Sequence, residues 1–368
     1  MRTLGRLIVV WVVAGACLAA ATAALAPQAI AVFTAGRSTI PNIDLDPLAQ
    51  NSRVYDSAGN LMAVLHAEEN RSPVTLDQVP DDVITTILAV EDEDFYSHGG
   101  VNLTATMRAL LTNIDSGELR QGGSTITQQV VKNSLLSPKK DVNRKVKEAV
   151  LALRLEDEME KDEILQRYVN TVYLGNGAYG MQAAGELYFG KDVEELTLAD
   201  AALLAGLISN PSTYDPFTQP EAAKERRRIA LDRLVDVGRI TAEEAAVIGE
   251  EPIPSEPQRL LPKPDDYFVE EVKQRLLDSD LLGDTPVERY NAVFRGGLEI
   301  HTTFDPRAHF LAIRSRNEVL GDIDDVLLGG DDTTGRFTAA IATLDPRSGA
   351  VRALVGGPGF DKYKYNLA

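Results

Sequence analysis

The chain has little cysteine, histidine or basic charge. One of its 368 residues is a cysteine, Cys17, and four are histidines: His66, His98, His301 and His309. A single cysteine excludes an internal disulfide and a cysteine-rich metal site, and the histidines show no metal-ligand spacing. The net charge of −18 argues against nucleic acid as a partner, because that surface needs a basic stripe.

The first 36 residues indicate the compartment. Leu7 to Ala26 is an apolar run of twenty residues, enough to cross a hydrocarbon core of about 30 Å. Arg2 and Arg6 precede this run, which favours a cytoplasmic N-terminus. We therefore expect residues 1–36 to form a cytoplasmic tip and a single-pass anchor in the cell membrane, with the rest of the chain extracellular or periplasmic.

Two alternatives to an uncleaved anchor stay open. Ala24-Leu25-Ala26 resembles a signal-peptide cleavage site, although Pro27 would follow the cut and the apolar run is longer than usual. A lipoprotein signal at Cys17 is the weaker alternative, because the residues before it, Ala14-Gly15-Ala16, lack the usual leucine.

Periodicity and proline placement divide the remaining chain. A linker at 37–75 carries a short hairpin, with strands at Val54-Tyr55 and Leu61–Leu65. A helical domain follows at 76–250, and prolines mark a linker at 251–295 that contains a helix around 267–278. Residues 296–368 return to strand patterns and include a second hairpin, Phe337–Leu344 with Ala350–Leu354.

The most informative stretch is AVEDEDFYSHGG at 89–100, where an apolar helical run ends in four acids. Glu91 continues the apolar face of Ile87 and Leu88. Acids are electrostatically misplaced at a helix C-terminus. Partial burial, like-charged neighbours and the helix end would raise the pKa of Glu91, which suits a general base. The alternative is a solvated acidic helix end.

The second stretch is QGGSTITQQVVKN at 121–133. Ser124 or Thr125 can begin a helix after the glycines. Helical spacing then predicts one polar face that suits an anion or a sugar, made of Thr125, Gln128, Gln129 and Lys132. The alternative for Thr125 and Gln128 is an ordinary capping box.

The third stretch is a helix beginning near Ser137-Pro138, which carries Arg144, Lys145 and Glu148 beside its apolar stripe. Two cations near a carboxylate can clamp a pyrophosphate or a metal phosphate. The alternative is a surface ion pair between Arg144 and Glu148.

Together with Lys161–Gly180 and Glu225–Leu234, these stretches resemble the five ordered motifs of the family 51 glycosyltransferase domain of class A penicillin-binding proteins. The first three match E-D-x-x-F-x-x-H-x-G, G-[AG]-S-T-[IL]-T-Q-Q-x-x-K-N and R-K-x-x-E. Glu148 lies 57 positions after Glu91, and this interval also fits the family. The resemblance covers about residues 50–250.

The resemblance implies a mainly α, lysozyme-like glycosyltransferase domain that polymerises lipid II and releases undecaprenyl pyrophosphate with inversion. It implies that Glu91 and Glu148 are catalytic. Expected contacts with substrate and phosphate are Arg108, Ser124, Thr125, Gln128, Lys132, Arg144 and Lys145. Expected supporting residues are Asp92, Phe95, His98, Gln129 and Asn133.

The implied partners are lipid II, the growing glycan strand, the membrane, and proteins of cell-wall elongation or division. Mg²⁺ or Mn²⁺ could act with Glu148 through the pyrophosphate, and we expect no organic cofactor. Two other functions stay open: a lysozyme-like glycan hydrolase, since paired glutamates also cleave glycosides, and an inactive membrane-anchored scaffold.

Residues 296–368 resemble the start of a transpeptidase domain, through GGLEIHTTFDP at 296–306 and LDPRSGAVRALVGG at 344–357. The family's serine nucleophile in S-x-x-K is expected after Ala368. Ser137-x-x-Lys140 fits that pattern by accident, and no K-T-G occurs. We therefore expect the sequence as given to have no transpeptidase activity and to form no covalent penicillin adduct.

Overall fold

The computed structural model describes residues 43, 45, 47–67, 70–102, 104, 123–135, 142–258, 266–320, 339–357, 359–361 and 364–368. The expected anchor lies outside them. Within these ranges, no helix is both long and apolar enough to span a membrane. Helices make up most of the regular structure, which confirms a mainly α chain.

Contacts divide the chain into a first unit, Met1–Asp46 with Glu91–Tyr168, and a second unit, Pro47–Val90 with Val169–Ala368. The helices of the first unit are α4 (Ile126–Ser134), α5 (Val142–Glu158) and most of α6 (Lys161–Thr171). The last residue of α2 (Asp81–Glu91) also belongs to it.

Apolar burial holds the first unit together. Helix α4 packs against α5. Each of the three helices buries side chains three or four positions apart, as an amphipathic helix does. The buried residues are Ile126, Val130 and Val131 of α4, Val150, Ala152 and Leu155 of α5, and Ile164, Leu165 and Tyr168 of α6. Burying one large apolar side chain contributes about 1.5–3 kcal/mol.

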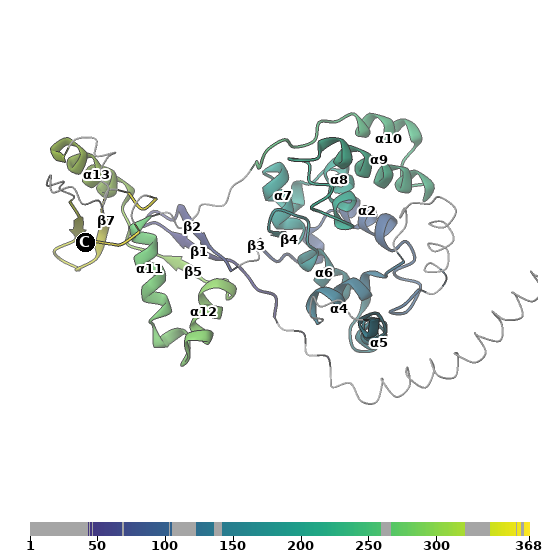
Figure 1. The fold of residues 1–368 in the computed structure, drawn as a ribbon, viewed down its shortest axis with the longest axis horizontal. Helices are drawn as coiled ribbons and strands as arrows, with labels where there is room; N and C mark the ends of the chain where they lie inside the picture. Colours follow the sequence, from purple (N-terminus) through teal and green to yellow (C-terminus); the bar gives the residue numbers. More distant parts are fainter. Residues whose placement is uncertain are drawn as a thin grey trace, which may run out of the picture. The chain divides into compact units, whose positions relative to one another are not determined.

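The second unit contains two groups of helices, labelled in Figure 1. Its elements before β5 are β1 (Ser52–Tyr55), β2 (Leu61–Leu65), β3 (Asn70–Arg71), α2 apart from its last residue, β4 (Ala178–Tyr179), α7 (Met181–Phe189), α8 (Leu198–Ile208), α9 (Pro220–Asp236), α10 (Ala242–Gly249), α11 (Tyr267–Leu277) and α12 (Pro286–Arg295). Short 3-10 helices cover Leu76–Gln78, Val193–Glu195 and Asp280–Leu282. Helices α8, α9 and α10 pack around Ala202, Leu231 and Leu234.

The predicted first hairpin is confirmed. Strand β1 pairs antiparallel with β2. The carboxylate of Asp56 closes the turn by accepting the backbone N–H groups of Ala58 and Asn60, both at 2.8 Å. Strand β5 (Glu299–His301) joins the other edge of β1 in parallel, so the linker sheet includes a strand far along the sequence.

The end of the chain is more helical than its strand patterns predict. Strands β6 (Ile341–Leu344) and β7 (Val351–Val355) form the expected second hairpin, and α11 forms where a helix is expected. The expectation of strands is wrong for α13 (Pro306–Leu320), and the linker at 251–295 holds a second helix, α12, beyond the one expected. The sequence does contain a helix-start pattern for α12. Thr285 and Glu288 form a capping box, and Pro286 occupies the first helical position.

Gly100 sits where the loop after α2 touches α5. A β-carbon at Gly100 would overlap the backbone carbonyl of Ala152, whereas one at Gly99 would meet no atom within 4 Å. Gly100→Ala should therefore lower the free energy of unfolding by about 1–3 kcal/mol, the usual cost of overpacking. Thermal unfolding measures the effect, with Gly99→Ala as the matched control. Equal melting temperatures for the two variants would contradict this packing.

Candidate functional site

The acidic end of α2 carries the first expected catalytic residue. Glu91 is the last residue of the helix and is half-buried. Its Oε2 accepts a hydrogen bond from Nε2 of Gln129 on α4, at 2.6 Å. The alternative of a freely solvated helix end is therefore wrong for Glu91, whose neighbour Glu93 is exposed.

Asp92 ties the loop after α2 to the start of α4. Its side chain is buried, and Oδ1 contacts Nε2 of His98 at 2.7 Å. Its Oδ2 accepts the backbone N–H of Ile126, the first residue of α4, at 3.0 Å. A carboxylate at a helix N-terminus is favoured by the exposed backbone amides and by the helix dipole. Asp92 and His98 therefore shape the loop that follows Glu91.

The start of α6 holds the middle of the same loop. Phe95 is fully buried, and Nζ of Lys161 lies 4.4 Å from the centre of its ring. The hydroxyl of Tyr96 donates to Asp162 at 2.8 Å. Partial burial, followed by this contact, raises the pKa of Tyr96 to about 12, so the phenol keeps its proton at neutral pH.

The start of α4 confirms the capping-box alternative. The side chain of Thr125 accepts the backbone N–H of Gln128, and the side chain of Gln128 accepts the backbone N–H of Thr125. Both residues are buried, and the Thr125 hydroxyl also donates to the carbonyl of Gly100 at 2.7 Å. The four residues of the predicted polar face therefore have different surroundings, because Lys132 is exposed, Gln129 is half-buried, and Thr125 and Gln128 are buried. Asn133, an expected supporting residue, is exposed.

Helix α5 carries the second expected catalytic residue. Glu148 is buried, with 3% of its side chain exposed, and it pairs with Nζ of Lys145. The same ammonium donates to the hydroxyl of Ser124 at 2.9 Å. Arg144 is half-buried one position earlier. The alternative of an exposed Arg144–Glu148 surface pair is wrong, since Glu148 is buried and its ion pair is with Lys145.

No group of three or more His, Cys, Asp or Glu side chains suited to a metal ion occurs in the described ranges. Glu148 could supply one oxygen ligand, but it already faces an ammonium. A divalent ion would therefore need most of its ligands from a bound phosphate. Arg108, an expected phosphate contact, lies outside the described residues.

Sequence reasoning missed four residues of this unit. The hydroxyl of Thr127 donates to Glu156, and Glu156 pairs with Lys161 at 2.8 Å. The hydroxyl of Tyr168 donates to Oε1 of Gln129 at 3.3 Å. Helical spacing marks Tyr168 as a core residue of α6, but no sequence signal shows where its hydroxyl points.

The fifth motif, Glu225–Leu234, contains a buried arginine. Arg227 is 2% exposed and donates to the carbonyls of Gly249, at 2.6 Å, and Glu251. Burial lowers the pKa of Arg227, and the carboxylates of Glu251, Asp200 and Glu250 oppose that shift. Arg227 therefore fastens the segment after α10 to α9.

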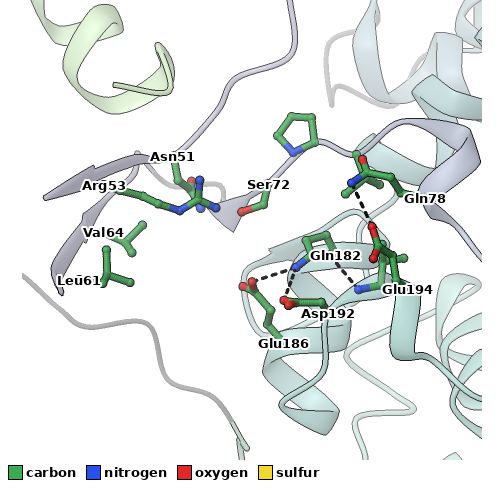
Figure 2. Close-up of a pocket in the computed structure, with 13 residues that line it drawn as sticks. Asn51, Arg53, Leu61, Val64, Ser72, Gln78, Gln182, Glu186, Asp192 and Glu194 are labelled. Atoms are coloured by element: carbon green, nitrogen blue, oxygen red, sulfur yellow. Dashed lines mark hydrogen bonds between the residues drawn. The ribbon is translucent and has the colours of Figure 1, made fainter. Parts of the chain in front are cut away.

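The second unit also has a polar cleft of about 420 Å³, in which the sequence predicted no site residue. Figure 2 shows Gln182 between two carboxylates that line it, Glu186 and Asp192. Nε2 of Gln182 donates to both at 2.9 Å, and its Oε1 accepts the backbone N–H of Val193.

Residues 58–235 match the family model described as Transglycosylase. Penicillin-binding protein 1A of Aquifex aeolicus is 38% identical over 272 residues, which cover 74% of this chain and 36% of that protein. Penicillin-binding protein 1A of Mycolicibacterium smegmatis is 39% identical over 324 residues, which cover 85% of this chain and 39% of that protein. These matches identify residues 58–235 as a transglycosylase-family domain of the kind found in class A penicillin-binding proteins. The chain spans less than two-fifths of the length of these two relatives.

A crystal structure of penicillin-binding protein 1A from Haemophilus influenzae is also similar, with 20% sequence identity and a TM-score of 0.46. The similarity covers 88% of this chain and 50% of that chain.

The ion pair on α5 gives a prediction for stability. Lys145→Met leaves the buried carboxylate of Glu148 without its ammonium. We expect a loss of about 1–3 kcal/mol, below the usual cost of breaking a buried pair because the lysine reaches solvent. Thermal unfolding measures this loss. Lys147→Met, at an exposed position of the same helix, is the control, and an equal effect of the two changes would contradict the pairing.

Proposed function

We propose that the chain polymerises lipid II into glycan strands for the bacterial cell wall. The observation that carries this proposal is the environment of Glu91, a half-buried carboxylate held by the Gln129 amide and followed directly by the buried Asp92. A general base needs such a fixed position, because its oxygen must lie about 2.6–3.2 Å from the atom that carries the proton it takes.

In the proposed reaction, Glu91 accepts the proton of the acceptor's 4-hydroxyl group. The acceptor oxygen forms a bond to C1 of the growing chain, while the bond between C1 and the pyrophosphate oxygen breaks. Undecaprenyl pyrophosphate leaves with the bonding electrons. This single displacement inverts the anomeric centre.

The leaving group gains negative charge, which preorganised cations stabilise. Lys145 is the best placed of the described cations, because Glu148 and Ser124 fix its ammonium. Lys132, Arg144 and Arg108 are proposed as further phosphate contacts. Thr125 and Gln128 act indirectly in this account, since their capping box sets the start of α4.

Mg²⁺ or Mn²⁺ is proposed only as a companion of the pyrophosphate. Such an ion would neutralise phosphate charge, with Glu148 as the one protein carboxylate proposed to reach it. The steps assigned above to Glu91 and Lys145 do not depend on the ion.

The proposal extends to the setting of the reaction. Residues 7–26 would anchor the chain in the membrane that holds lipid II, with the catalytic domain at the outer face and lysozyme-like in its fold. Proteins of elongation or division are proposed as partners. A glycan hydrolase is less well supported, because its second carboxylate must be free to act on water or sugar, whereas Glu148 is paired with Lys145.

Glu91→Gln tests the base. We expect polymer formation to fall at least about 100-fold, the lower range for losing a general base, while lipid II still binds. The measurement is product length after incubating detergent-solubilised protein with labelled lipid II.

Glu93→Gln is the matched control, because Glu93 is exposed two residues away and should keep wild-type activity. Polymer formation by Glu91→Gln at the wild-type rate would refute the assigned base. No polymer from a folded wild-type chain that binds lipid II would favour a scaffold instead.

A further inference from the structure

The carboxylate of Glu91 is connected through one amide to a buried phenol. Gln129 donates from Nε2 to Oε2 of Glu91 at 2.6 Å. Its other amide atom, Oε1, accepts the hydroxyl of Tyr168 at 3.3 Å. The Tyr168 side chain is fully buried, so the phenol is fixed within the packing of the first unit.

The phenol remains a donor at any working pH. Burial, followed by the charges of Glu91 and Asp92, raises the pKa of Tyr168 well above its usual value. Asp92 is itself held by His98 and by the backbone of Ile126. The Gln129 amide is uncharged, so it can transmit orientation between the phenol and the carboxylate without titrating.

An amide can sit in this position in two orientations. With its oxygen toward Tyr168, its N–H group faces Glu91 and stabilises the ionised carboxylate. With the amide reversed, its oxygen faces Glu91, which is favourable only when that carboxyl is protonated and donates. The structure has the first orientation, in which the phenol donates to the amide oxygen while the amide N–H group faces Glu91.

We propose that Tyr168 is a positioning residue, whose hydroxyl holds the Gln129 amide in the orientation that keeps Glu91 ready to accept a proton. Its effect on catalysis rests on the proposed function. Its effect on the protonation of Glu91 does not.

Tyr168→Phe removes the hydroxyl and keeps the ring. We expect the acid limb of the pH profile for polymerisation to move up by about half to one pH unit, the shift that one hydrogen bond can produce. At pH values below the acid limb, kcat of the variant should be about three- to tenfold lower than that of the wild type. Above it, kcat should recover, while lipid II binding stays unchanged throughout.

Tyr188→Phe is the matched control. Tyr188 is also fully buried, and its hydroxyl donates to the carbonyl of Leu174 at 2.8 Å, within the second unit. That variant should lose stability without moving the acid limb. In a Gln129→Met background, Tyr168→Phe should cause no further shift, because the connecting amide is gone.

Carbon-13 NMR of the side-chain carboxyls, with Glu91 assigned through Glu91→Gln, measures protonation without requiring activity. A higher titration midpoint for Glu91 in Tyr168→Phe supports the proposal. An unchanged midpoint in a folded variant, or an equal shift in Tyr188→Phe, overturns it. If the wild-type chain forms no polymer while Tyr168→Phe still raises the titration midpoint of Glu91, that result would reject the proposed function and support the positioning role of Tyr168.

Discussion

The buried carboxylate of Asp92 is the constraint on which the candidate site depends. It joins His98 and the first backbone amide of α4, so the loop after α2 and the start of α4 share one anchor. An isolated buried charge is costly, but this one has donors on both oxygens. Because Gln129 lies on α4, the same anchor sets its distance from Glu91.

The two proposed catalytic glutamates have different surroundings. Glu91 meets a neutral amide backed by a phenol, and Glu148 meets an ammonium. Environments that separate the behaviour of two carboxyl groups are typical of acid–base sites. The amide contact fits the proposed role of Glu91 in accepting a proton, and the ammonium contact fits the proposed place of Glu148 beside a phosphate.

Sequence reasoning predicted what depends on short spacings. It predicted both hairpins, the helix at 267–278, and the capping of α4 by Thr125 as one of two alternatives. It did not predict that Gln128 is buried, or that Glu148 selects Lys145 rather than Arg144. Those outcomes depend on tertiary packing, which helical periodicity does not contain. The hydrogen bond from the Tyr168 hydroxyl also depends on tertiary packing, because its acceptor, Gln129, lies on another helix, α4.

We propose that this chain transfers a glycosyl group by a single displacement assisted by Glu91. The most direct measurement is NMR of wild-type reaction products made from lipid II labelled with carbon-13 at the anomeric carbon. The account predicts a glycosidic linkage of inverted configuration, together with release of undecaprenyl pyrophosphate. A retained configuration, or a free reducing sugar in place of the linkage, would contradict it.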